Sequence, residues 1–426
     1  MTPYVITFIV MVGVFMIGCF AFKLPVGVSM LIAALCGALE GGLGTETMMV
    51  EVEFVYVDTI LTIGCAMIFM KVIEGSGALD ALSSLIIEKF HRFPAVLLVL
   101  IMLIIMFPGM ITGSSTAAVL SAGSIMAPVL ALMGIDAVTS GSIIAMGALL
   151  GMIAPPVNTA ALIICAGIDV PYVGFEGPLA LITFPLAILF VLLLGYKQAR
   201  HMDYEKLKPA LEKQDAIRKQ YGVRIYIPLL VLVALMVIFK VLKLGEDIGM
   251  PLMFLISAAV GLFTGKKINV LTAVPEAIRT AAPVMGILMG VGMFIEVMTA
   301  TGVRGLVVIS CLRLPSTLWL LACAISIPLF GAVSSYGACS VLGVPFAYIY
   351  ASLLGGNSVV VLAAISLIAA VGDMMPPTAL AGLFAAQVTG VEKYTKILKR
   401  CIVPIIILLV YACFFLANSK LIAGLF

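Results

Sequence analysis

The sequence predicts an all-α polytopic membrane protein whose two halves form an inverted repeat. Of its 426 residues, 63% are apolar and only 11% are charged, and the mean hydropathy is +1.26. A soluble domain carries about 25% charged and about 45–50% apolar residues, so this chain has more apolar surface than a water-soluble core can bury. Apolar runs of about 20 residues, the length of a membrane-spanning helix, recur along the chain. Several motifs of the first half return in the second.

The composition also excludes several classes of function. The net charge is only +3, and no basic run is interleaved with aromatic residues, which argues against a nucleic-acid reader. Nine cysteines in apolar stretches form no CxxC pair, and two histidines make a zinc site improbable. No nucleotide-binding motif and no Ser/His or His/Asp constellation is present, so we expect neither an ATP-driven pump nor an enzyme.

Ten stretches are apolar and long enough to be single spans. Tyr4–Phe22 is interpreted as a retained span rather than a signal peptide, because no basic residue precedes it and its apolar run is too long. The predicted spans are residues 4–22, 24–41, 54–72, 137–168, 178–196, 225–243, 250–264, 280–300, 358–389 and 401–419.

Two further stretches are too long for one crossing. Residues 94–135 and 314–371 carry no charge, and part of the second belongs to the next span. Each must fold back near its middle, at Thr112–Ser115 and at Ser334–Gly337. We predict hairpins over 94–135 and 314–352; periodicity leaves open whether they are re-entrant or pairs of full crossings.

Loop charges predict the orientation. The linker 197–224 holds eight basic residues and is placed in the cytoplasm by the positive-inside rule. Counting spans from it puts the acidic loops 43–53 and 169–177 outside, together with both termini. Short segments over 78–93 and 303–314, and the basic run 391–400, are interpreted as interfacial arms, and charged residues 202–220 as a solvated cytoplasmic helix.

The two halves share an ordered set of motifs. The predicted organisation is a first repeat over 1–196, the linker 197–224 and a second repeat over 225–426. An odd number of crossings in each half makes the second repeat enter the membrane upside down, and the loop charges invert accordingly. Inverted repeats indicate a secondary transporter with its site where the repeats meet. The matches are Ile68–Ile73 with Met293–Met298, Gly77 with Gly302, Ser114 and Ser115 with Ser334 and Ser335, and Gly151, Pro155 and Pro156 with Gly372, Pro376 and Pro377.

The Pro-Pro pairs predict that spans 137–168 and 358–389 are broken helices. Proline removes a backbone donor and moves the preceding residue away from helical dihedrals. In lipid, freed backbone groups need a cavity, an ion or a ligand beside them, although a packing kink is the alternative. Asp373 is the only charged residue between Arg313 and Glu392. Beside unwound carbonyls it suits a sodium ion or a proton; the alternative is a protonated structural carboxyl group.

Other polar residues flank these breaks. Asn158 and Thr378 follow the prolines and offer oxygens or amide donors to a ligand, or cap the next half-helix. The hairpin tips could present helix N-termini to an anion, or use serine and glycine only as turn residues. Lys71 and Glu296 lie near span ends, where such side chains usually reach for the interface, and we leave them out of the site.

Three runs give the chain a family resemblance. Thr112–Ala118, Gly123–Pro128 and Gly147–Pro156 resemble the large membrane subunit of the tripartite ATP-independent periplasmic (TRAP) transporters, within the ion transporter superfamily. The resemblance implies re-entrant hairpins, an elevator-type transport domain, sodium coupling, no organic cofactor, and carboxylate substrates such as C4-dicarboxylates or sialic acid. It also implies a periplasmic binding protein, a small membrane subunit and a bacterial or archaeal inner membrane.

Carried over to this sequence, the resemblance implies two sets of site residues. The sodium set is Gly113, Ser114, Pro155, Gly372, Asp373 and Pro376, and the substrate set is Ser114, Ser115, Asn158, Ser334, Ser335 and Thr378. Pro156 and Pro377, the second prolines of the two pairs, are carried over with them.

Two segments depart from the family pattern. Gly249–Gly261 lacks the family's Thr-Pro-Thr-Glu-like stretch, and Gly355–Asn357 replaces an acidic-Pro turn. The alternative is therefore a self-sufficient sodium- or proton-coupled carboxylate symporter of the same superfamily. A channel and a membrane enzyme are more distant rivals.

Overall fold

The computed structural model describes residues 3–44, 57–200, 216–242, 245–313, 315–333, 336–376 and 379–426. Over these ranges the secondary structure is helical, with no strand. In that part of the chain, seven helices are long and apolar enough to cross a membrane, or up to eight if a bent pair counts as one span. The all-helical, many-span prediction is confirmed.

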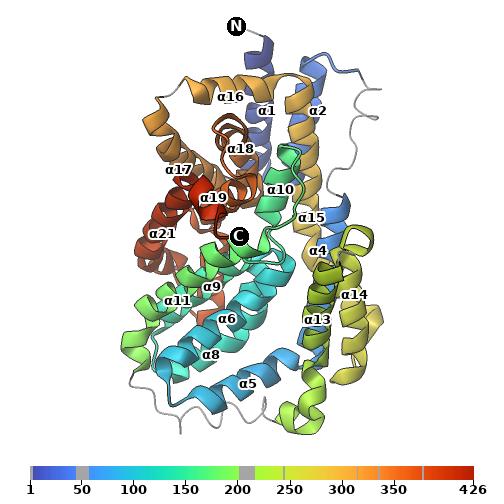
Figure 1. The fold of residues 1–426 in the computed structure, drawn as a ribbon, viewed down its shortest axis with the longest axis vertical. Helices are drawn as coiled ribbons and strands as arrows, with labels where there is room; N and C mark the ends of the chain where they lie inside the picture. The colour runs from blue at the N-terminus through green and yellow to red at the C-terminus, as the bar shows by residue number, and fades with distance from the viewer. Residues whose placement is uncertain are drawn as a thin grey trace.

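Six helices form an elongated group that we call the column, on the right and at the top of Figure 1. Within it α2 packs on α1 and α15, and α4 packs on α14 and α15. The column consists of α1 (Pro3–Phe20), α2 (Val26–Glu40), α4 (Val57–Ser76), α13 (Ile227–Leu242), α14 (Gly245–Thr264) and α15 (Val270–Ala300). A short 3-10 helix, η2 (Gly222–Tyr226), leads into α13.

Two short helices connect the column to the rest of the molecule. α5 (Ala78–Phe90) follows α4, and α16 (Val303–Leu312) follows α15. Both elbows turn at a glycine with positive φ, Gly77 at 81° and Gly302 at 75°. Glycine adopts this conformation without steric cost, so both elbows are built in the same way. The axes of α4 and α5 differ by 62°.

The remaining helices form a second group, which we call the bundle. Its first half comprises α6 (Pro94–Thr112), α7 (Ser115–Ala118), the π-helix η1 (Val119–Gly123), α8 (Ser124–Leu132), α9 (Ala137–Gly151), α10 (Thr159–Gly167) and α11 (Glu176–Ala199). Its second half comprises α17 (Ser316–Val333), α18 (Tyr336–Ala347), the π-helix η3 (Tyr348–Leu353), α19 (Ser358–Ala370), the 3-10 helix η4 (Val371–Met374), α20 (Leu380–Thr389), α21 (Tyr394–Ala417) and α22 (Ser419–Ala423). The order of elements in the first half, including the π-helix, therefore recurs in the second.

The halves of the bundle exchange their broken helices. α10 packs on α18 and α19 of the second half, and α20 packs on α9 and η1 of the first. The segment after each break thus lies against the other repeat. This places the two breaks close to the boundary between the repeats.

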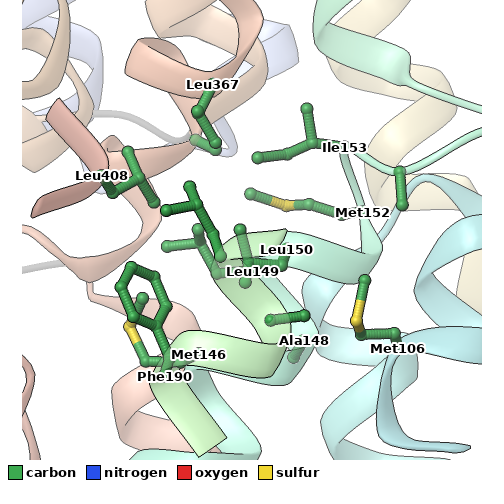
Figure 2. Packing of buried hydrophobic residues seen from close by; sticks show 14 of the residues in the cluster. Met106, Met146, Ala148, Leu149, Leu150, Met152, Ile153, Phe190, Leu367 and Leu408 are labelled. Atoms are coloured by element: carbon green, nitrogen blue, oxygen red, sulfur yellow. The ribbon is translucent and has the colours of Figure 1, made fainter. Parts of the chain in front are cut away.

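A large apolar core holds the bundle together. Phe190 of α11, Leu150 of α9 and Leu367 of α19 are all fully buried in one cluster (Figure 2). Burying one such side chain contributes about 1.5–3 kcal/mol. Where α6 crosses α9, a Cβ added to Gly151 would lie 2.5 Å from the backbone oxygen of Met106. Only glycine permits this close approach of the two backbones.

Most predicted spans match helices, with two differences. The span expected at 280–300 begins at Val270, because Glu276 and Arg279 lower the hydropathy without interrupting the helix. The basic run 391–400 is not a separate arm, because α21 begins at Tyr394 and continues through it. The acidic loop 45–53, the start of span 54–72 and residues 201–215 of the linker lie outside the described residues.

Candidate functional site

The first hairpin turns at Gly113, where polar atoms satisfy the ends of both helices. Gly113 has a φ of 62°. The Thr112 hydroxyl donates to the carbonyl of Pro108 at 2.7 Å and accepts from the Ser114 amide at 3.3 Å. Oγ of Ser114 accepts from the Ala117 amide at 3.3 Å, which makes Ser114 the N-cap of α7. The predicted fold-back point is therefore where α6 ends.

The first broken helix lies against this tip. α9 ends at Gly151 and α10 begins at Thr159, with the cis Pro155–Pro156 peptide between them. The amide of Val157 donates to the carbonyl of Met110 at 3.1 Å, and the Thr159 hydroxyl donates to the carbonyl of Gly113 at 3.2 Å. The unwound segment and the hairpin tip thus satisfy each other's backbone groups, as a membrane interior requires.

Asn158 serves the fold at this break. Its Oδ1 accepts from the Ala161 amide at 2.9 Å and so caps α10. Its Nδ2 donates to the carbonyl of Ile153 at 3.1 Å and to Oγ of Ser366 on α19 at 2.8 Å. The side chain is fully buried and each of its polar atoms has a partner inside the bundle. This geometry assigns Asn158 to bracing the break against the second repeat.

The second broken helix brings a carboxylate to the same place. Asp373 lies on η4, directly after α19, and is 1% exposed. Its Oδ2 accepts a hydrogen bond from the hydroxyl of Ser115, at the start of α7. The amide of Ala381 in α20 interacts favourably with the carboxylate. Its other oxygen, Oδ1, is buried and accepts no hydrogen bond from the described residues.

A cavity of about 130 Å³ lies beside this carboxylate, between the bundle and the column. Ser114, Ser115 and Asp373 line it from the bundle, together with Leu380, the first residue of α20. Thr280 lines it from α15 of the column. The starts of two bundle helices therefore meet a carboxylate at one cavity.

The predicted site residues are only partly brought together. Ser114, Ser115 and Asp373 line the cavity, Gly113 adjoins it at the tip, and Gly372 is buried next to Asp373. Asn158 and Pro155 are at the first break but are not lining residues, and Pro376 is exposed. Ser334, Ser335, Pro377 and Thr378 lie outside the described residues.

The structure adds residues that sequence reasoning missed. Thr159 and Thr280 line the cavity. Lys71 lines a second cavity of about 330 Å³, which shares Thr116, Ala117 and Thr280 with the first. Thr159 directly follows Asn158, so its position at the first break could have marked it in the sequence as a candidate site residue. Nothing in the sequence around Thr280 marked it, because a threonine on a long helix is ordinary.

The fold and site define a polytopic membrane protein of the secondary-transporter kind, with two broken helices and a buried carboxylate between repeats. The chain belongs to the family described as tripartite ATP-independent periplasmic transporter, DctM component, which matches residues 12–419. This confirms the resemblance predicted from the hairpin and Pro-Pro motifs. Membership of a transporter family is also consistent with the expectation that the chain is not an enzyme.

The structure is similar to the crystal structure of the YdaH transporter of Alcanivorax borkumensis, which is described as having an unusual topology. The TM-score is 0.58 at 16% sequence identity, over 89% of this chain and 90% of that chain. At this identity the similarity shows the fold alone. A comparison with curated proteins found no match.

Proposed function

We propose that this protein imports a small organic anion coupled to sodium, as the large membrane component of a three-part transport system. The observation that carries the proposal is Asp373, buried at the boundary of the repeats with Oδ1 unpartnered among the described residues. An ionised carboxylate at membrane depth is costly unless a cation or strong donors compensate it.

Sodium is the coupling ion that these groups favour. It is a hard cation that prefers oxygen ligands, as calcium and magnesium do. Asp373, Ser114 and Ser115 line one cavity, and their carboxylate and hydroxyl oxygens are ligands of the kind that sodium prefers. A bound sodium ion would neutralise Asp373 and hold η4 against the hairpin tip. Ion binding would therefore order the place where the substrate binds.

The same cavity suits an organic carboxylate. Helix N-termini present free amides and the positive end of the helix dipole, which favour an anion. The helical run beginning at Ser115 and helix α20, beginning at Leu380, both start at the cavity. Apolar side chains of α15, such as Ile287 and Leu288, cover its other side. C4-dicarboxylates, sialic acid and related carboxylates are the proposed substrates.

The separation into bundle and column supports an elevator mechanism. Most of the site lies on the bundle, and α15 of the column covers it. α5 and α16 join the two groups through the elbows at Gly77 and Gly302. In this mechanism the bundle carries the site across the membrane, and the elbows absorb the change of angle. The basic linker faces the cytoplasm, both termini lie outside, and a small membrane subunit and a periplasmic binding protein complete the system.

Uptake of labelled succinate, malate and sialic acid into proteoliposomes tests this function. The chain is reconstituted alone and together with a periplasmic binding protein and a small membrane subunit of the same family of systems. We expect saturable uptake that requires an inward sodium gradient and all three components. Uptake by the chain alone would establish a self-sufficient symporter, and uptake driven by a proton gradient without sodium would refute sodium coupling.

A further inference from the structure

The second cavity is adjacent to the first. The two cavities share Thr116 and Ala117 of the hairpin and Thr280 of the column as lining residues. From there the second cavity, of about 330 Å³, reaches Glu74 near the end of α4 and Asp80 on α5. The starts of α5 and α13 lie at the lower end of the column in Figure 1.

Its lining suits an organic anion. Met67, Met70 and Leu120 provide apolar surface for a carbon skeleton, and Ser124 is an exposed hydroxyl. Among the described residues that line it, Lys71 is the only basic one. Lys71 is a quarter exposed, so its ammonium group remains accessible from the cavity.

Lys71 is shared between two carboxylates. Its Nζ lies 3.0 Å from Oε1 of Glu276 on α15 and 3.2 Å from Oε2 of Glu74 on its own helix. The Glu276 side chain is 65% exposed, and ion pairs this exposed are held weakly. Asp80, the other acid besides Glu74 that lines the cavity, interacts with Lys266. An incoming carboxylate could therefore replace Glu276 at Lys71 at little cost.

We propose that the second cavity is the passage through which the substrate leaves the site, and that Lys71 binds the substrate carboxylate there in exchange for Glu276. This inference rests on the proposed function, because it takes the substrate to be an organic anion. Competition from Glu276 and Glu74 keeps the affinity of Lys71 for the substrate carboxylate low, as a point of release requires. Lys71 thus acts after the site at Asp373, on the same route.

The test measures the electrostatic potential in the cavity without using transport. Ser124→Cys places a thiol in the lining. Its reaction rates with anionic 2-sulfonatoethyl methanethiosulfonate and with the cationic trimethylammonioethyl analogue are compared in inside-out membrane vesicles. Any effect of Lys71 on the thiol pKa changes both rates equally, so the anion-to-cation ratio of the rates reports the local charge. Parent protein without Ser124→Cys gives the background from native cysteines.

The two partners of the exposed ion pair should shift this ratio in opposite directions. Lys71→Gln should lower it by about three- to tenfold, because a unit charge close to the thiol is lost. Glu276→Gln should raise it, and Lys71→Arg should retain the parent ratio. Lys89→Gln is the matched control, because Lys89 lies on α5 at the same face but does not line the cavity.

Two results would overturn the inference. One is an unchanged anion-to-cation ratio in Lys71→Gln, and the other is no reaction of Ser124→Cys with reagents added outside the inside-out vesicles. Lys71→Arg keeps the positive charge at this position. A ratio that falls in Lys71→Gln but not in Lys71→Arg therefore reports the lost charge and not a disturbed structure. The proposed function fails separately, if the parent protein shows no sodium-driven anion uptake whatever the labelling ratio is.

Discussion

The hydroxyl of Ser115 donates a hydrogen bond to Oδ2 of Asp373, and the two residues are 258 positions apart in sequence. Ser115 begins the returning arm of the first hairpin, and Asp373 lies in the break of the second broken helix. The bond therefore joins the two repeats at the one buried carboxylate that lines the cavity.

Asp373→Asn should abolish the sodium dependence of uptake while the protein remains folded. The amide has nearly the shape of the carboxylate but lacks the charge that a sodium ion requires. Uptake measured against sodium concentration, with size-exclusion behaviour as the folding check, tests this. Asp136→Asn is the matched control, because Asp136 caps α9 at a loop, away from the cavity. Sodium dependence that survives in Asp373→Asn would refute the ion site.

Ser115→Ala should raise the sodium concentration for half-maximal uptake by roughly tenfold or more. A hydrogen bond to a charged group contributes about 1.5–3 kcal/mol, and here it holds Asp373 in place. Ser142→Ala serves as the control, because its hydroxyl donates to the carbonyl of Val138 within its own helical segment and the residue lines neither cavity. Equal sodium curves for the two variants would show that the Ser115 bond does not shape the site.

Gly113→Ala should destabilise the protein by roughly 1–3 kcal/mol more than Gly134→Ala. Both glycines have positive φ, 62° and 84°. A Cβ at Gly113 would lie 2.1 Å from Oγ1 of Thr159, whereas at Gly134 nothing lies within 4 Å. The difference between them isolates the close packing of the hairpin tip. Thermal unfolding in detergent measures it.

Thr159→Ala should recover part of the loss in Gly113→Ala, because it removes the oxygen that the new Cβ meets. It also removes the hydrogen bond from Thr159 to the Gly113 carbonyl, so the recovery is incomplete. If the two changes are simply additive, the tip is not packed against Thr159 as described.

Asn158→Ala should lower stability by about 2–4 kcal/mol with or without substrate. It removes the cap of α10 and the bond to Ser366 of the other repeat. Asn357→Ala is the matched control, because Asn357 caps α19 in the corresponding way but is exposed, so only about 0.5–2 kcal/mol is lost. A loss in Asn158→Ala that substrate fully restores would return Asn158 to the binding site.

Local signals in the sequence predicted most of the fold. Spans follow from apolar length, and the breaks at Pro155 and at Asp373–Pro376 follow from proline geometry, which needs no long-range information. The predicted span 280–300 is shorter than α15, which begins at Val270, because hydropathy measures contact with lipid, whereas a helix continues into water past Glu276. Helix ends and membrane boundaries are different properties.

The candidate site was predictable only in part, because it is made by contacts between distant segments. Asp373 stood out as a lone charge, and Ser115 as part of a hairpin tip, but nothing local showed that they bond to each other. The sequence left both capping and ligand binding open for Asn158, and its hydrogen bonds to the Ala161 amide and to Ser366 favour a role in the fold. The sequence around Lys71 indicates only an interfacial lysine, whereas the structure places it in the lining of the second cavity.

The most direct test of the central claim is anion uptake by the reconstituted three-component system, with and without an inward sodium gradient, in parent protein and Asp373→Asn. We expect saturable, sodium-driven uptake in the parent and none above the gradient-free level in the variant. Uptake in the parent that is the same with and without sodium would contradict it.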